Sequence, residues 1–237
     1  MTKIDNVSIA SRFCGPPDSG NGGYSVGLLA REFDYRAEVT LRMPPPLDTP
    51  MSIKRVRIEH GGEIARMLDG DHVVGEAAAW QGELTPPAMI PGQDAAHAAQ
   101  SYAGFHHHHF PSCFVCGPER GEGDGLRIFP GASGHGNVFA APWTPSESLA
   151  DADGKIDPLF IAAALDCPGY FSLAMEDKAL LGRMALHISG SLRLGETAIV
   201  VAHKEGEEGR KRFASTAIYG QGGNLVAASR QVWIVLK

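Results

Sequence analysis

The stretch DPLFIAAALDCPGYFSLAM, residues 157–175, decides the fold because it predicts a helix that is buried on nearly every side. Asp157 is a good N-cap, and Pro158 suits the first helical turn, where a missing N–H costs nothing. The residues after Pro158 are apolar nearly all round, which is typical of a helix inside a core. Asp166 is the only charged side chain among them.

Strand-like segments rich in β-branched and aromatic residues follow this helix, with glycine-containing turns between them. They are residues 184–194, 198–203, 212–219 and 225–236. One buried helix followed by a meander of long strands predicts an α+β fold, in which an antiparallel sheet wraps the helix.

The first part of the chain repeats this plan. A short strand at residues 7–13 precedes a helix at residues 22–33, capped by Asn21 or Asp18. The strands expected after it are residues 37–43, 51–59, 63–68 and 72–80.

Gly and Pro are concentrated between Gln81 and Pro130, where the periodicity of apolar residues is lost. We therefore predict a first unit at residues 1–81, a linker at residues 82–112 and a second unit at residues 113–237.

Composition excludes several classes of function. The net charge is −6, whereas a nucleic-acid partner requires a basic face. No run approaches the ~18 apolar residues that span a bilayer, and the N-terminus lacks the apolar core of a signal peptide. We expect a cytoplasmic protein without nucleic-acid or membrane partners, and its four cysteines would stay reduced there.

A short motif carries a family resemblance. Residues 113–126, CFVCGPERGEGDGL, resemble the Cys-x-x-Cys-Gly…Gly-Leu lead-in of the phenylacetate-pathway type of acyl-CoA thioesterase. The order of strand, apolar helix and meander resembles the hot-dog fold, and the two copies resemble the double hot-dog thioesterases. The resemblance implies two central helices, each wrapped by an antiparallel sheet, and an acyl-CoA substrate. We expect no cofactor beyond the coenzyme A of that substrate, and no metal.

Asp166 is the sharpest candidate for catalysis. A lone carboxylate in an apolar helix is costly to bury unless it is paired or used. Burial also raises the pKa of a carboxyl group, which suits acid/base work. The structural alternative is an Asp that satisfies the backbone where Pro168 breaks the helical hydrogen bonding.

Asn21, Gly22, Gly23 and Tyr24 begin the first helix. Glycines let a ligand approach the backbone, and the unpaired N–H groups of a first helical turn suit an oxyanion. A flexible N-cap is the plainer interpretation. If these residues form part of a thioesterase site, as the resemblance implies, the N–H group of Gly23 polarises the thioester carbonyl together with that of Gly22. Asn21 positions water or the acyl group, and Tyr24 forms pocket wall.

The two halves lose complementary parts of the family's helix motif, which is similar to His-Gly-Gly with an Asp nine residues after the His. The first half has Asn21-Gly22-Gly23, but Ala30 stands at the acid position. The second half has Asp157-Pro158-Leu159 and keeps the acid as Asp166. In relatives with one hot-dog unit per chain, the active site of the dimer takes the glycines from one subunit and the Asp from the other. A tandem chain would therefore keep one site, with Asp166 as base or as nucleophile.

Three other groups of residues suggest weaker alternatives. The basic residues Arg210, Lys211 and Arg212 would contact the phosphates of coenzyme A, or form an exposed hairpin. The histidines at 106–109, with Cys113 and Cys116, would offer zinc ligands, although packed thiols beside a solvated loop explain them as well. Cys167 would be a nucleophile only with a partner that the nearby sequence lacks.

Two competing functions remain open. A hot-dog hydratase or dehydratase would pair the acid with a His, and His187 is the nearest one in sequence. A non-catalytic acyl-CoA or lipid-binding module would bind without turnover. Because hot-dog sheets have exposed edges, we also expect a homodimer.

Overall fold

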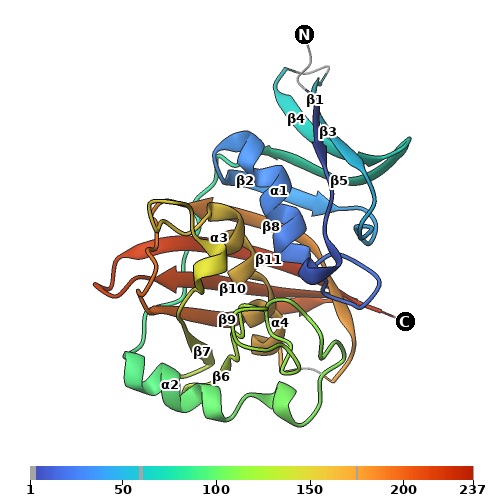
Figure 1. Cartoon of the computed structure of the whole chain (residues 1–237). Coiled ribbons are helices and arrows are strands. Elements are labelled where there is room, and N and C mark those ends of the chain that lie inside the picture. Colours follow the sequence, from blue (N-terminus) through green and yellow to red (C-terminus); the bar gives the residue numbers. More distant parts are fainter. Residues whose placement is uncertain (1–3, 59–60, 175, 237) are drawn as a thin grey trace.

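The computed structural model describes residues 4–58, 61–174 and 176–236, and within them eleven strands form one antiparallel sheet (Figure 1). The strands are β1 (Ile4–Val7), β2 (Arg36–Leu41), β3 (Met51–Arg57), β4 (Glu63–Asp69), β5 (His72–Ala79), β6 (Gly131–Ala132), β7 (Val138–Trp143), β8 (Ala179–Ile188), β9 (Ala198–Glu208), β10 (Lys211–Tyr219) and β11 (Leu225–Val235). The α-helices are α1 (Gly22–Ala30), α2 (Gly92–Gln100), α3 (Pro158–Ala164) and α4 (Asp166–Ser172). The expected α+β class is confirmed.

The strand order repeats itself from the two edges of the sheet toward its centre. The order is β1-β3-β4-β5-β2-β8-β11-β10-β9-β7-β6. In one half the strands from the outside inward are β1, β3, β4, β5 and β2. In the other half they are β7, β9, β10, β11 and β8, and the short strand β6 lies outside this repeat. The halves meet where β2 pairs with β8, with Val39 opposite Met184. Each half therefore supplies a strand, then helix, then four strands, of which the last three form a meander and the first pairs with the last.

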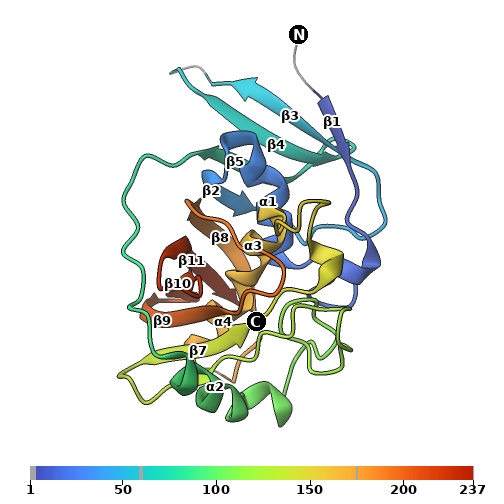
Figure 2. The ribbon, with the colours of Figure 1, turned by 60° about the vertical axis from the view of Figure 1, so that its left-hand side comes forward.

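Helices α1 and α3 lie side by side at this join (Figures 1 and 2). Gly27 of α1 permits the contact, because a Cβ atom there would lie 2.7 Å from Leu159 Cδ1 and 3.0 Å from Ala162 Cβ. Nearly all of α1 is buried, as its apolar sequence predicts. The join is therefore a helix–helix contact as well as a strand pair.

The helix expected at residues 157–175 is present as two segments, α3 and α4, divided at Leu165. Pro168 has no N–H to offer the carbonyl of Ala164, which disturbs the regular ladder there. The Leu165 N–H bonds the carbonyl of Ala162, a tighter turn than in an α-helix. Residue 175 lies outside the described residues. No helix in the described part of the chain is long and apolar enough to cross a membrane.

Three features differ from the sequence-based expectation. The stretch expected to be a linker contains α2, which packs on β7; its alanines and glutamines favour helix despite the surrounding Gly and Pro. Strand β7 was not expected, and it contains Pro142, which argues against a central strand. That proline is tolerated because β6 pairs only with Phe139 and Ala140, leaving β7 an edge strand at Pro142. The first strand ends at Val7, and residues 11–13 form a 3-10 turn instead.

Candidate active site

Asp166 contacts the first turn of α1 from across the join. Its Oδ2 accepts a hydrogen bond from the side-chain amide of Asn21 at 2.8 Å and another from the N–H of Gly23 at 2.9 Å. Its side chain is only 2% exposed. The structure therefore brings Asn21, Gly22, Gly23 and Asp166 together, although they come from opposite halves of the chain.

Asn21 has two functions at this point. Its Oδ1 accepts the N–H of Tyr24 at 2.9 Å, which caps α1. Its Nδ2 donates to Asp166. An amide side chain offers an acceptor to the helix and a donor to a carboxylate on two separate atoms, so Asn suits this position where an ionised Asp, which only accepts, would not.

The two glycines of α1 make room for the contact. A Cβ atom at Gly23 would lie 2.6 Å from Asp166 Cβ and 3.0 Å from the carbonyl oxygen of Ala162. A Cβ atom at Gly22 would lie 3.0 Å from Leu181 Cβ. The two glycines therefore permit close packing of α1. From sequence alone, their presence had been explained by the approach of a ligand.

The carboxyl group of Asp166 is held on one side only. Burial raises its pKa to about 7; the hydrogen bonds from Gly23 and Asn21 oppose this shift, and the charge of Cys113 adds to it. Among the described residues, Oδ1 of Asp166 has no hydrogen-bond partner. A buried oxygen without a partner is rare in a folded protein and commonly marks a position that a ligand or water fills.

A cavity of about 250 Å³ opens beside this carboxylate. Asn21, Gly22 and Asp166 line it, and so does Arg42, the one Lys or Arg among its lining residues. Most of the remaining wall is apolar or aromatic and includes Tyr170, from the second half. An apolar cavity with a few convergent polar groups is the usual form of a small-molecule site.

Three buried thiols line the same cavity beside Asn21, and they belong to Cys113, Cys116 and Cys167. Hydrogen bonds from the thiols of Cys116 and Cys167 hold the pKa of Cys113 well below its usual value, with help from the N–H groups of Cys116 and Val115. Burial raises the pKa values of Cys116 and Cys167. The sequence placed Cys113 and Cys116 together but did not indicate that Cys167 joins them.

The other predicted binding residues lie away from the cavity. Tyr24 does not line it and instead stacks on Phe13, with ring centroids 4.3 Å apart. Lys211 and Arg212 pair with glutamates of the same hairpin, at 3.8 and 3.6 Å, and Arg210 does not line the cavity either. The structure gives no support to a role for Tyr24 or for the hairpin in binding.

A buried polar network beneath α4 was not foreseen. The side chains of Thr216 and Gln231 both donate to the carbonyl of Leu165, the residue before Asp166. Ser229 and Trp233 complete the network through Thr216 and Gln231. The signal was available, because Ser229, Gln231 and Trp233 alternate on one face of β11. The network fixes the backbone from which Asp166 projects.

Neither a protein-family profile nor a curated protein sequence matches the chain. Solved structures match its fold over nearly the whole length. The tesB protein of Mycobacterium avium subspecies paratuberculosis is 12% identical, with 99% of this chain and 93% of that one covered and a TM-score of 0.63. Acyl-CoA thioesterase II TesB2 of Mycobacterium marinum is 16% identical, with 98% and 93% covered and a TM-score of 0.60.

A protein of unknown function with a hot-dog fold, from Alicyclobacillus acidocaldarius, is 12% identical. The alignment covers 99% of this chain and 94% of that one, with a TM-score of 0.64. The chain therefore has the hot-dog fold that the sequence predicts.

Proposed function

We propose that the chain is a thioesterase of the hot-dog superfamily that hydrolyses an acyl-CoA at one composite site between its two halves. The observation that carries this proposal is the buried carboxylate of Asp166. One of its oxygens is held by Asn21 and Gly23, and the other has no partner among the described residues. The similarity of the fold to that of an acyl-CoA thioesterase supports the same reaction type.

In the proposed reaction, Asp166 Oδ1 takes a proton from a water molecule in the cavity. The water oxygen attacks the thioester carbonyl carbon, and the carbonyl oxygen becomes an oxyanion. The C–S bond then breaks, a free acid forms, and Asp166 returns the proton to the coenzyme A sulfur. Direct attack by Asp166 would instead form a mixed anhydride, which hydroxylamine would trap.

Gly22 N–H is the proposed donor to the oxyanion. Gly22 lines the cavity at the first turn of α1, where N–H groups lack helical partners and the helix dipole is positive. Gly23 N–H was the first choice from sequence, but it already donates to Asp166. Gly23 is therefore proposed as a positioning residue for the base.

We further propose a double hot-dog architecture, with the units at residues 1–81 and 113–237. The repeated strand order and the side-by-side contact of α1 with α3 support it. Superposition of β1–β5 on β7–β11 in an experimental structure would test it. Helices that failed to superpose along with the strands would contradict it.

The decisive experiment is turnover against a panel of acyl-CoAs, measured by release of free thiol. Asp166→Asn should lower turnover by about a hundredfold or more, while binding of a non-hydrolysable acyl-CoA is retained. Asp157→Asn is the matched control, because it makes the same change at an exposed helix cap. Tight binding without turnover by the wild-type protein would favour the binding module instead.

The acid–histidine pair that the sequence suggested for a hydratase or dehydratase, Asp166 with His187, is not brought together at the cavity. His187, the histidine nearest to Asp166 in sequence, pairs with Arg36 and Ala228 in the sheet and does not line the cavity. Enoyl-CoA hydration by the same preparation, without thiol release, would reverse this preference.

We also propose that the protein is a cytoplasmic homodimer. All four cysteines are free thiols, and the outer strands β1 and β6 leave sheet edges that a second copy would cover. A light-scattering mass near 25.2 kDa would contradict the dimer, and recovery of the protein outside the cytoplasmic fraction would contradict its location.

A further inference from the structure

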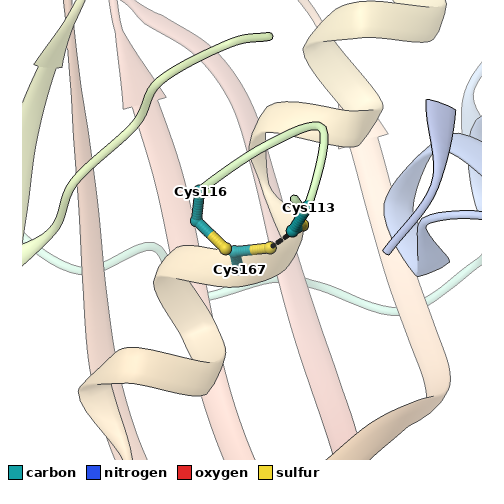
Figure 3. Close-up of side chains that lie close together, drawn as sticks. All are labelled: Cys113, Cys116 and Cys167. Carbon is teal, nitrogen blue, oxygen red and sulfur yellow. Dashed lines mark hydrogen bonds between the residues drawn. The ribbon is translucent and has the colours of Figure 1, made fainter. Parts of the chain in front are cut away.

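Cys113, Cys116 and Cys167 form a compact cluster of sulfur atoms. All three lie within 4.8 Å of one another, and each side chain is at most 6% exposed. Figure 3 shows Cys113 and Cys116 on one loop facing Cys167 on α4. The proposed hydrolysis uses none of these thiols.

We propose that Cys113, Cys116 and Cys167 bind one Zn²⁺ as three thiolates, with the fourth ligand position open toward the cavity beside His108. This replaces the sequence-based expectation that no metal is bound. It rests on the arrangement of the sulfur atoms and their surroundings, and it is independent of the proposed hydrolysis.

The sulfur spacing fits a tetrahedral site. Zinc–sulfur bonds of about 2.3 Å at tetrahedral angles place two sulfurs about 3.8 Å apart. Cys113 Sγ and Cys167 Sγ are 3.6 Å apart, and all three pairs fall within 4.8 Å. A change of at most about 1 Å in any sulfur–sulfur separation would bring the three sulfurs to a common metal ion.

The loop that carries Cys113 and Cys116 is rigidly held. Gly117 N–H donates to the carbonyl of Cys113 at 2.9 Å, closing a tight turn. A Cβ atom at Gly117 would lie 2.4 Å from the carbonyl oxygen of Pro111, so only glycine fits there. Tyr102 anchors the loop through a 2.9 Å bond from its hydroxyl to the carbonyl of Cys116.

The polar groups around the sulfurs are donors suited to thiolates. His108 lies beside Cys116 Sγ. Asn21 Nδ2 lies 3.8 Å from Cys113 Sγ and 3.9 Å from Cys167 Sγ. Three packed neutral thiols would not need these donors, whereas thiolates on a metal are stabilised by them.

His108 is placed to support the metal rather than to bind it directly. Its Nε2 lies 3.4 Å from Cys116 Sγ, and its Nδ1 accepts the N–H of Phe110 at 2.9 Å. A neutral ring that accepts at Nδ1 carries its proton on Nε2, so Nε2–H donates to Cys116. Nε2 is also not among the ligand atoms that lie within 4.8 Å of all three sulfurs.

The test measures zinc on the full chain, purified under reducing conditions without a nickel column. We expect one zinc per chain, and replacement by Co²⁺ should give a thiolate-to-cobalt charge-transfer band and the visible bands of a tetrahedral site. Cys116→Ser should abolish both signals. Because these measurements need no turnover, they test the zinc proposal independently of the thioesterase proposal.

Matched variants locate the ion. Cys14→Ser removes the fourth buried cysteine, which lies outside the cluster, and should leave one zinc. Replacing His106, His107 and His109 with Ala should also leave one zinc. His108→Ala should weaken zinc binding by about 10- to 100-fold, as loss of a hydrogen bond to a ligand usually does.

Three outcomes would overturn the proposal. One is wild-type protein with four titratable thiols and no bound zinc after zinc addition, which would make the cluster ordinary core packing. Another is a Cys113–Cys167 disulfide in reduced preparations. The third is zinc that survives Cys116→Ser but disappears with the three histidines. If Cys116→Ser fails to fold, the cobalt spectrum of the wild type still decides the matter.

Discussion

The side-chain amide of Asn21 lies 2.8 Å from Asp166 Oδ2, although 145 residues separate the two in the chain. The same amide caps α1, so a single side chain joins the helix of the first half to the acid of the second. The two halves therefore meet in one group of contacts, with Asn21 and Gly23 from the first half and Asp166 from the second.

Asn21→Asp separates the two functions of that amide. Aspartate still accepts the Tyr24 N–H, but it replaces the donor to Asp166 with a second carboxylate. Because a hydrogen bond to a charged group is worth about 2 kcal/mol, we expect at least this loss in the free energy of unfolding. Urea denaturation would measure it. Asn137→Asp makes the same change at an exposed position, and an equal loss there would contradict the prediction.

Gly23→Ala tests the close approach of the helices. The added Cβ would lie 2.6 Å from Asp166 Cβ, and the nearby backbone of Ala162 and Ala163 has little freedom to move. We expect a loss of about 1–3 kcal/mol in unfolding free energy from overpacking, together with reduced turnover. Gly92→Ala is the control, because its Cβ would meet only Ile199 Cδ1 at 3.6 Å. An unchanged midpoint for Gly23→Ala would contradict the packing described for this join.

Glu76 gives a prediction about pH and stability. It accepts hydrogen bonds from Arg42 and Arg66 at 2.9 and 2.8 Å. Burial alone would raise the pKa of Glu76, but the hydrogen bonds and charges of the two arginines outweigh it and lower the pKa below 4.5. A lowered pKa in the folded state adds stability above the unfolded pKa, and that stability is lost as the pH falls through the folded value.

The unfolding free energy of Glu76→Gln should therefore fall furthest below that of the wild type near neutral pH. The difference should shrink as the pH falls below about 4.5. Denaturant titrations at several pH values would show it, with the exposed Glu122→Gln as a charge control. A difference that stays constant down to pH ~3 would contradict a role for the ionised carboxylate.

Asp166 and the Gly22-Gly23 turn could be identified from sequence, because each breaks a local pattern. A charge inside an apolar helix and two glycines at a helix start are visible without any tertiary information. Their contact was inferred only through the resemblance to a two-subunit site. The sequence did not show which of the two glycine N–H groups bonds to the acid, because this depends on which group faces Asp166 in the folded protein.

Other features depend on contacts that no local pattern records. Cys167 joins Cys113 and Cys116 only because α4 packs against their loop. Strand β7 contains Pro142, which weakens any prediction of strand until the edge position is known. Arg42 carries no signal in sequence, since it becomes a cavity residue only through the fold.

Arg42 lines the cavity, and we propose it, in place of Arg210, Lys211 and Arg212, as the residue that contacts the phosphates of a coenzyme A substrate. Glu76 holds the guanidinium group of Arg42 through Nε and Nη2. We expect Arg42→Ala to raise KM for an acyl-CoA by about thirtyfold, which corresponds to the ~2 kcal/mol of one hydrogen bond to a charged group, with little change in kcat. Lys211→Ala, on the hairpin outside the cavity lining, should leave KM unchanged.

An acyl-pantetheine substrate, which lacks the phosphates, completes the test of Arg42. If Arg42 contacts a phosphate, the KM values of wild type and Arg42→Ala should converge on this substrate, because the lost interaction is absent from both. A ratio that persists would mean that Arg42 acts by shaping the cavity wall. An increase in KM for Lys211→Ala, but not for Arg42→Ala, would restore the hairpin of Arg210, Lys211 and Arg212 as the phosphate contact.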